Sequence, residues 1–337
     1  MTIEQMAEDL GISKSTVSRA LSGKGRIGED TRKRVQDYAR RTGFWKEEEA
    51  AELPNGTNRS ANPNLGVVIP ADALDASIPF FQECLLGICE AAALLNYDVL
   101  ITRGTANDNA SLERLVNSRK VDGIILTRSL ENDRALKYLT DIGFPVGLVG
   151  TCDDDRVIQV DADNQGASES LTGMLIGQGY RKFALVVGDI TYKVNRARYQ
   201  GFCDACEQRG VETAKQLIYT GMTNSEMIDN LVSNMIAERV ECIVCGDDVI
   251  CTRIMSKLQA EGYRIPKDIS IVSLYNSFSL ECFSPAVTAL NFSARQTGNM
   301  LARQMIDCLR GNEYSKKTMM SYDILFRRST DQAYRSR

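Results

Sequence analysis

The feature that most restricts the fold is a regular alternation, from Leu65 onward, of short apolar runs with longer stretches of helical periodicity. Such alternation is typical of parallel β-sheets covered by crossover helices. The pattern runs to about residue 162 and restarts near Asp163, so we expect an α/β body of two lobes, each a doubly wound parallel sheet. The expected strands are 65–70, 97–102, 122–126, 146–150, 182–189, 216–221, 242–247 and 270–275, and the expected helices lie at 80–95, near 112 and 136, from 163 to 178, and around 202 and 255.

Open sheets of this kind bind ligands outside the carboxyl ends of their strands, so two facing lobes predict a cleft for a small molecule. A Rossmann oxidoreductase is disfavoured, because the first strand and the residues after it, LGVVIPADALDAS, contain no glycine-rich phosphate loop. Histidine is absent, and no nucleophile–base constellation is recognisable. We therefore expect no enzymatic activity and no cofactor.

The N-terminal segment differs from the body in its charge. The whole chain has a net charge of −4, yet residues 1–46 carry ten Lys or Arg against six Asp or Glu. A basic segment within an acidic protein is typical of a small DNA-binding domain. The same segment predicts three short helices by its capping residues and periodicity. The first is bounded by Thr2 and Gly11, the second begins at Ser13, and the third runs from Gly28 to Gly43.

The second of these helices has two chemically different faces. Val17, Ala20 and Leu21 share one side and suit a core, whereas the opposite side is small, polar and basic. Small hydroxyl side chains permit close approach to the major groove, and an arginine can bind a guanine edge or a phosphate. The tight turn before this helix favours a helix-turn-helix over an ordinary helical bundle. The outward residues are Ser15, Ser18, Arg19 and Ser22.

The run EDLGISKSTVSRALSGKGRIGEDTRKRV resembles the head of the lactose-repressor and galactose-repressor family of bacterial regulators. The resemblance implies a homodimer whose two heads read a pseudo-palindromic operator in double-stranded DNA. It places Lys14 and Ser15 at the specificity-determining positions. The further contacts that it implies are base or phosphate contacts from Thr16, Ser18 and Arg19, and backbone contacts from Thr2 and Thr31.

Residues 46–64, KEEEAAELPNGTNRSANPN, are expected to link the head, residues 1–45, to the body, residues 65–337. In the resembled family this segment forms a hinge helix that inserts a leucine into the minor groove, which implies that role for Leu53. The chain departs from the family here, since Glu47, Glu48 and Glu49 replace neutral and basic residues. These carboxylates should weaken phosphate binding. Leu53 could instead be a linker residue without DNA contact.

The span from Leu65 to about Thr330 resembles the family's periplasmic-binding-protein-like body, through VDGIIL, VDADNQGA, ARYQGF, CGDDVI and SPAVTAL. The resemblance implies crossovers between the lobes. Lobe one then comprises about 65–162 plus 292–320, and lobe two about 163–291 plus 321–337. The implied effector residues are Phe80, Phe81, Thr127, Asp163, Arg198, Asp247, Tyr275 and Phe292, with Asn164 at the lobe junction.

Aromatic walls suit the apolar face of a sugar or base, and Arg and Asp satisfy its polar edge. Phe80 and Phe81 could equally be core residues, and Asp247 could simply cap the following helix. One position departs from the family, which reads Tyr-Asp-Asn where this chain has Leu274, Tyr275 and Asn276. A tyrosine brings bulk and a single hydroxyl in place of two acceptor oxygens, so we expect a smaller pocket that is less suited to a hexose.

Ten cysteines in a reducing compartment favour buried apolar residues over disulfides. Two C-x-x-C pairs, Cys203 with Cys206 and Cys242 with Cys245, raise a zinc or redox hypothesis. A shared site is disfavoured, because the first pair lies in a helical pattern and the second in a strand. We expect no metal. Neither a secretory signal nor a membrane span is recognisable, which predicts a cytoplasmic protein and disfavours a transport-type binding protein.

These observations together predict a transcription regulator, most simply a repressor, whose operator affinity depends on a small molecule such as a sugar or related metabolite bound between two lobes. The alternative is that a protein partner controls operator affinity, or that no effector exists. Tyr275 leaves this alternative open because it makes the expected pocket less suited to a hexose.

Overall fold

The computed structural model describes residues 3–22, 27–41, 63–70, 79–105, 108–222 and 225–335. The chain divides into two compact units, Met1–Arg59 and Ser60–Arg337. The described part of the first unit is a three-helix domain of α1 (Ile3–Leu10), α2 (Lys14–Ser22) and α3 (Glu29–Arg41). Its small core consists of Met6, Ala7, Val17, Ala20 and Val35. The three predicted helices are confirmed, whereas Thr2 and Leu53 lie outside the described residues.

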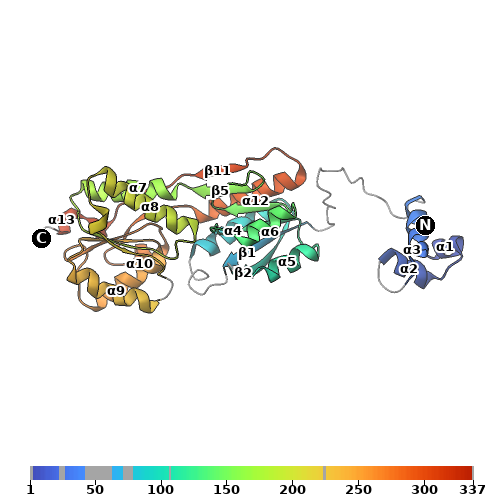
Figure 1. The fold of residues 1–337 in the computed structure, drawn as a ribbon, viewed down its shortest axis with the longest axis horizontal. Coiled ribbons are helices and arrows are strands. Elements are labelled where there is room, and N and C mark those ends of the chain that lie inside the picture. Colours follow the sequence, from blue (N-terminus) through green and yellow to red (C-terminus); the bar gives the residue numbers. More distant parts are fainter. Residues whose placement is uncertain are drawn as a thin grey trace. The chain divides into compact units, whose positions relative to one another are not determined.

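The second unit contains two parallel-dominated sheets, so the predicted α/β body is confirmed (Figure 1). Among the described residues the first sheet has the strand order β11-β5-β4-β3-β1-β2, and every pair is parallel. Its strands are β1 (Asn64–Pro70), β2 (Asp98–Gly104), β3 (Gly123–Leu126), β4 (Val146–Val149), β5 (Ile158–Ala162) and β11 (Lys317–Met320), accompanied by α4 (Pro79–Leu94), α5 (Ala110–Asn117), α6 (Arg134–Asp141) and α12 (Ala294–Arg310).

The second sheet has the order β12-β10-β9-β8-β6-β7 and is parallel except for β12, which pairs antiparallel with β10. The chain crosses between the lobes more than once, because β11 belongs to the first sheet and the later β12 to the second. The strands are β6 (Phe183–Val186), β7 (Leu217–Tyr219), β8 (Cys242–Cys245), β9 (Ser270–Ser273), β10 (Thr288–Asn291) and β12 (Asp323–Leu325), and the helices are α7 (Asn164–Gly177), α8 (Lys193–Gln208), α9 (Ser225–Ala237), α10 (Asp248–Ala260), α11 (Phe278–Cys282) and the short α13 (Gln332–Arg335).

The central strands read as unbroken apolar runs because helices cover both faces of each sheet. Every residue of β3, β4, β6, β8 and β9 is buried. The sequence pattern missed the strands β5, β10 and β11 and the helices α9, α11, α12 and α13. β5 and β11 carry polar or charged residues within or beside their apolar ones, IQVDA and KTMM, and therefore lack the uniform apolar signal of the central strands.

Three glycines allow the helices that border the cleft to pack closely through their backbones. A Cβ on Gly87 of α4 would overlap the carbonyl oxygen of Arg295 in α12, and a Cβ on Gly298 of α12 would overlap that of Cys84. In the second lobe, a Cβ on Gly201 of α8 would overlap the carbonyl oxygen of Gln165 in α7. The absence of side chains at these points lets each helix pair touch through its backbone. α4 and α8 are thereby held against their lobes.

Candidate functional site

The turn before α2 is built by two residues with special backbone roles. Gly11 ends α1 at φ 66°, a left-handed conformation that glycine adopts without steric cost. The amide of Ile12 donates to the carbonyl of Ala7 at 3.0 Å, which closes the helix end. The hydroxyl of Ser13 accepts from the amide of Thr16 at 3.2 Å and so caps α2. The expected helix–turn–helix geometry is present in the described residues.

The two faces of α2 are separated as its sequence indicates. Val17 and Ala20 are fully buried in the head's core, whereas Lys14, Ser15, Ser18 and Arg19 are exposed. Two of the other expected contact residues are less open. Thr16 and Thr31 are half-buried, and the Thr16 hydroxyl lies 2.8 Å from that of Ser13. The exposed face offers small hydroxyl side chains and two cations, which is the chemistry that major-groove recognition requires.

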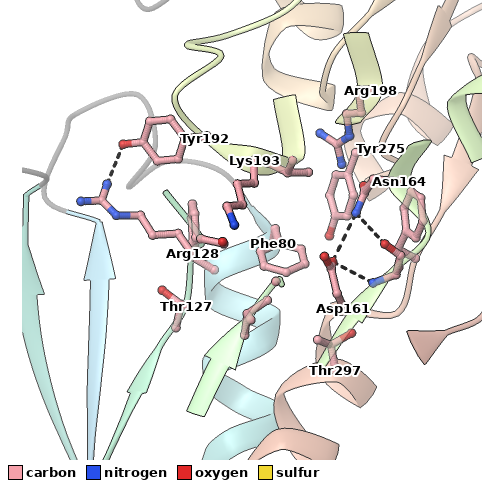
Figure 2. A pocket seen from close by; sticks show the side chains of 17 residues that line it. Phe80, Thr127, Arg128, Asp161, Asn164, Tyr192, Lys193, Arg198, Tyr275 and Thr297 are labelled. Atoms are coloured by element: carbon pink, nitrogen blue, oxygen red, sulfur yellow. Dashed lines mark hydrogen bonds between the residues drawn. The ribbon is translucent and has the colours of Figure 1, made fainter. Parts of the chain in front are cut away.

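A cavity of about 120 Å³ lies between the two lobes, at the carboxyl ends of the parallel strands (Figure 2). Six of the eight expected effector residues line it. They come from both lobes, since Phe80 and Phe81 begin α4, Thr127 follows β3, and the others belong to the second sheet and its helices. The lining consists of Phe80, Phe81, Thr127, Arg128, Ser129, Val149, Gly150, Asp161, Ala162, Asn164, Tyr192, Lys193, Val194, Arg198, Tyr275, Phe292 and Thr297.

The apolar part of the cavity is an edge-to-face cluster of aromatic rings. The ring of Phe80 meets Phe81 at a centroid distance of 5.6 Å and Tyr275 at 5.8 Å, with interplanar angles of 88° and 74°. These contacts hold the three rings against one another. Burial raises the pKa of Tyr275 well above its usual range, so its hydroxyl remains neutral. This wall can contact the apolar face of a small organic ligand.

Arg198 provides a buried cationic group of the cavity lining. Only 7% of its surface is exposed, and its Nη1 donates to the carbonyl of Gly246 at 2.8 Å. Its Nε has no hydrogen-bond partner among the described residues. Desolvation lowers the pKa of the guanidinium from its usual value. Arg198 is therefore a buried cation that keeps an unused donor.

Asp161 is a lining residue that the sequence did not indicate. Its carboxylate accepts from the amide of Ala162 at 2.8 Å and from Nδ2 of Asn164 at 3.4 Å (Figure 2). Burial raises its pKa to about 6, although Arg198 and Lys193 oppose the shift. Asp161 lies near the end of β5, a strand that was not predicted because its sequence mixes polar with apolar residues. Recognising that strand would have placed Asp161 at the carboxyl edge of the sheet.

Two expected effector residues, Asp163 and Asp247, lie outside the lining. The Asp163 carboxylate is exposed and accepts from the amide of Gly166 at 2.8 Å, which caps α7. Asp247 caps α10 by accepting from the amide of Ile250 at 2.8 Å. Burial raises the pKa of Asp247 to about 6, and Arg198 counters that shift. Each carboxylate therefore serves a helix end in this structure, and the expected contacts of Asp163 and Asp247 with an effector stay predictions.

Arg128, Tyr192 and Lys193 also line the cavity and were missed. Arg128 Nη1 donates to the Tyr192 hydroxyl at 2.6 Å (Figure 2). Lys193 Nζ donates to the carbonyl of Thr151 at 3.1 Å. Both hydrogen bonds join the lobes. These residues lie in the turn after β3 and at the start of α8, where no periodic signal distinguishes them. Only the approach of the two lobes reveals their shared position.

Residues 62–326 match the family model for periplasmic binding proteins and the sugar-binding domain of the LacI family, and residues 2–45 match that for bacterial regulatory proteins of the lacI family. The chain belongs to the LacI family. The resemblance stated from the sequence is confirmed, and the protein is a helix-turn-helix transcription regulator with a LacI-type body.

Its LacI-family relatives align with it nearly end to end. The transcriptional regulator RegA of Clostridium saccharobutylicum is 24% identical over 98% of this chain and 99% of its own length. MalR of Staphylococcus xylosus is 26% identical over 93% and 92%. A solved structure described as a probable maltose operon repressor, MalR of Staphylococcus aureus, has 26% identity and a TM-score of 0.75, covering 82% of this chain and all of that one.

The described residues of the LacI-type chain also bear on metal binding, on the cysteine pairs and on membrane spanning. Across the described ranges, no group of three or more His, Cys, Asp or Glu side chains is arranged to hold a metal ion. The paired cysteines are separate, since Cys203 and Cys206 lie on α8 and Cys242 and Cys245 lie in β8. No described helix has the length and apolarity needed to span a bilayer.

Proposed function

We propose that this LacI-family regulator acts in the cytoplasm as a homodimeric repressor whose affinity for operator DNA is set by a small molecule bound between its lobes. The observation that carries the proposal is the cavity at the carboxyl ends of both sheets, lined from both lobes and containing the buried Arg198. The exposed polar and basic face of α2 supports DNA recognition. Six expected effector residues lie in the lining, and Thr127 and Phe292 among them contribute a hydroxyl and an aromatic face.

The cross-lobe contacts suggest how the ligand would act. A ligand shifts a conformational equilibrium only if it binds the two states with different affinity. A molecule that touches Phe80 of the first lobe and Arg198 of the second would favour the arrangement in which the lobes stay together. Among structural neighbours, a CelR regulator was solved in complex with cellobiose and an Enterococcus faecium regulator with bound ribose, which is in keeping with a small-molecule effector.

We propose a homodimer because the expected operator is two-fold, and exposed apolar side chains in the first lobe are in keeping with an interface there. Leu86 and Leu94 of α4 are 47% and 70% exposed, and Ile101 of the edge strand β2 is 51% exposed. Such side chains are better placed in a subunit interface than in water. Sedimentation of the full chain should give a dimer mass.

Regulation without a small effector has one observation in its favour, namely the bulk of Tyr275 in a cavity of only about 120 Å³. A partner protein would then set operator affinity. Titrating the DNA complex with metabolites distinguishes the two, because only the effector mechanism predicts release or tightening by a small molecule alone.

The DNA-binding part is tested with the full chain and an operator selected from random duplexes. Arg19→Ala should reduce operator affinity roughly 5- to 150-fold per head, the range for losing one good base contact. Lys33→Ala removes one charge from an exposed site on α3 and serves as the control. It should weaken operator and random DNA equally. An unchanged fluorescence-anisotropy Kd for Arg19→Ala would refute the assignment of α2.

A further inference from the structure

The apolar wall of the interlobe cavity is built from aromatic rings of both lobes. Phe80 of the first lobe lies edge to face with Tyr275 of the second, with their ring centroids 5.8 Å apart (Figure 2). Phe292, which follows β10, adds a further ring to the lining and is 8% exposed. Val149 and Ala162 extend the apolar surface. Such a wall gains most from contact with another apolar face, above all an aromatic one.

The serine and threonine hydroxyls of the lining already donate to the protein. Thr127 Oγ1 donates to a backbone carbonyl at 2.8 Å, Ser129 Oγ to another at 2.8 Å, and Thr297 Oγ1 to a third at 3.0 Å. Each hydroxyl carries a single proton. These three side chains therefore have no donor left for a ligand in this arrangement of the lobes.

Charged side chains of the lining also have partners within the protein. Asp161 accepts from the amide of Ala162 and from the side chain of Asn164. Arg128 donates to the Tyr192 hydroxyl, and Lys193 donates to a backbone carbonyl. A ligand with many hydroxyl groups would have to displace these contacts or leave its own groups unpaired. Either outcome costs free energy.

The charge of Arg198 is compensated inside the protein. Asp247, Asp248 and Asp161 each act to raise the pKa of its guanidinium, against the lowering caused by burial. Its Nη1 also donates to the carbonyl of Gly246 at 2.8 Å. The cavity therefore does not require an anionic ligand to balance this cation.

Tyr275 differs from the other polar residues of the lining. Among the described residues its hydroxyl has no hydrogen-bond partner, and only its backbone bonds to Ser273. Burial raises the pKa of Tyr275 well above its usual range, so the hydroxyl stays neutral. A neutral phenolic hydroxyl can both donate and accept. The aromatic wall thus offers one polar group to a ligand.

The size of the cavity limits the ligand to about one ring. An apolar cavity of roughly 150 Å³ is able to bind one benzene molecule. The interlobe cavity has about 120 Å³. A second ring would require the lobes to move apart.

We propose that the effector is a small neutral aromatic molecule, a single ring with one hydrogen-bonding group. Its ring lies against Phe80 and Phe292, and its polar group meets the Tyr275 hydroxyl. This inference rests on the proposed function of the cavity as the effector site. It disfavours polyols, whose hydroxyl groups find few unused partners, and it disfavours anions, because acids already surround Arg198.

The test uses the full-length chain and probes of defined chemistry at millimolar concentration. Benzamide and benzyl alcohol are neutral single-ring probes, glucose and ribose are neutral polyols, and benzoate is an anion that matches benzamide in shape. Thermal shift identifies binding, since a ligand of the native state raises Tm, and calorimetry gives Kd. At least one neutral aromatic probe should bind about ten-fold or more tightly than both sugars, and benzamide about ten-fold more tightly than benzoate.

Variants connect this binding to the hydroxyl and to the ring wall. Tyr275→Phe keeps the ring and removes one hydrogen bond, so benzyl alcohol should bind roughly 2- to 12-fold more weakly. Toluene, which lacks the hydroxyl, should bind unchanged. Phe80→Leu removes an aromatic face and should weaken both probes by a similar factor, roughly 2- to 12-fold. Phe144→Leu alters a half-buried ring of the first lobe outside the lining and should leave Kd unchanged.

Tyr275→Phe carries the test if Phe80→Leu does not fold. The proposal is overturned if no aromatic probe binds, if glucose, ribose or benzoate binds as tightly as the neutral aromatic probes, or if both cavity variants bind like Phe144→Leu. A sugar that binds and changes operator affinity would overturn only the aromatic class and leave the effector function intact. Conversely, an aromatic probe that binds through Phe80 without changing operator affinity would support the ligand class and refute the regulatory function.

Discussion

Arg128 of the first lobe donates through Nη1 to the Tyr192 hydroxyl of the second at 2.6 Å, and its guanidinium carbon lies 5.2 Å from the centre of the tyrosine ring. The segments that contain Arg128 and Tyr192 make two further contacts with each other. The amide of Lys193 donates to the carbonyl of Ser129 at 3.1 Å, and Arg196 forms an ion pair with Glu131 at 2.6 Å. Residues 128–131 and 191–196 thus join the lobes beside the cavity.

Removal of this contact should weaken the arrangement in which the lobes are together. Tyr192→Phe keeps the ring but loses a hydrogen bond to a charged group, worth about 1.5–3 kcal/mol. Because the effector is expected to bind both lobes, its affinity should fall roughly ten-fold or more, as measured by calorimetry. Tyr219→Phe, which loses a surface hydrogen bond with Asn234, is the control and should bind normally. Equal affinity in both variants would contradict the coupling.

Gly201 should not tolerate a side chain. In Gly201→Ala the new Cβ would overlap the carbonyl oxygen of Gln165, so α7 and α8 must separate. Overpacking of this kind costs about 1–3 kcal/mol, and the expected fall in Tm is roughly 2–12 °C. Since α8 carries Lys193 and Arg198, effector affinity should fall as well. Calorimetric unfolding and ligand titration measure the two effects.

Gly177→Ala is the matched control for this prediction. Gly177 ends α7, and a Cβ there would meet no atom within 4 Å. Alanine is the better helix former, so Tm should stay constant or rise slightly. A loss of stability as large as that of Gly201→Ala would show that close helix packing is not the cause.

Asp161 should make the body less stable as the pH rises. Its folded pKa is about 6 and its ordinary value is 3.8, so the native state holds the proton more tightly than the unfolded chain. This contribution is complete below about pH 4 and is lost as the pH rises through about 6. Asp161→Asn should therefore match the parent near pH 4 and exceed it in Tm at pH 7.5.

The control for this pH effect is Asp141→Asn, which removes an exposed carboxylate paired with Lys137 on the surface. Its Tm difference from the parent should be small at both pH values, because exposed pairs contribute little. If Asp161→Asn were equally insensitive to pH, burial would not be the origin of the raised pKa.

Much of the fold could be predicted because its signals are local. Continuous apolar runs such as CIVC in β8 identify buried parallel strands, and the spacing of Val17 and Ala20 identifies the inward face of α2. β5 escaped notice because IQVDA mixes polar with apolar residues. Of the cavity residues, Phe80 and Arg198 came from the family resemblance. Asp163 and Asp247 came from it too, but hydrogen bonds to nearby amides direct them to helix ends.

The sequence by itself determined the repeated α/β pattern, the basic three-helix head and the chemical sides of α2, because each depends on residues only a few positions apart. The tertiary structure decided which side chains share the cavity. Arg128 and Tyr192 are separated by 64 residues and meet only because two sheets end at the same cleft. The burial of the Arg198 guanidinium, with Nη1 on the carbonyl of Gly246 after β8, likewise depends on packing that no local pattern encodes.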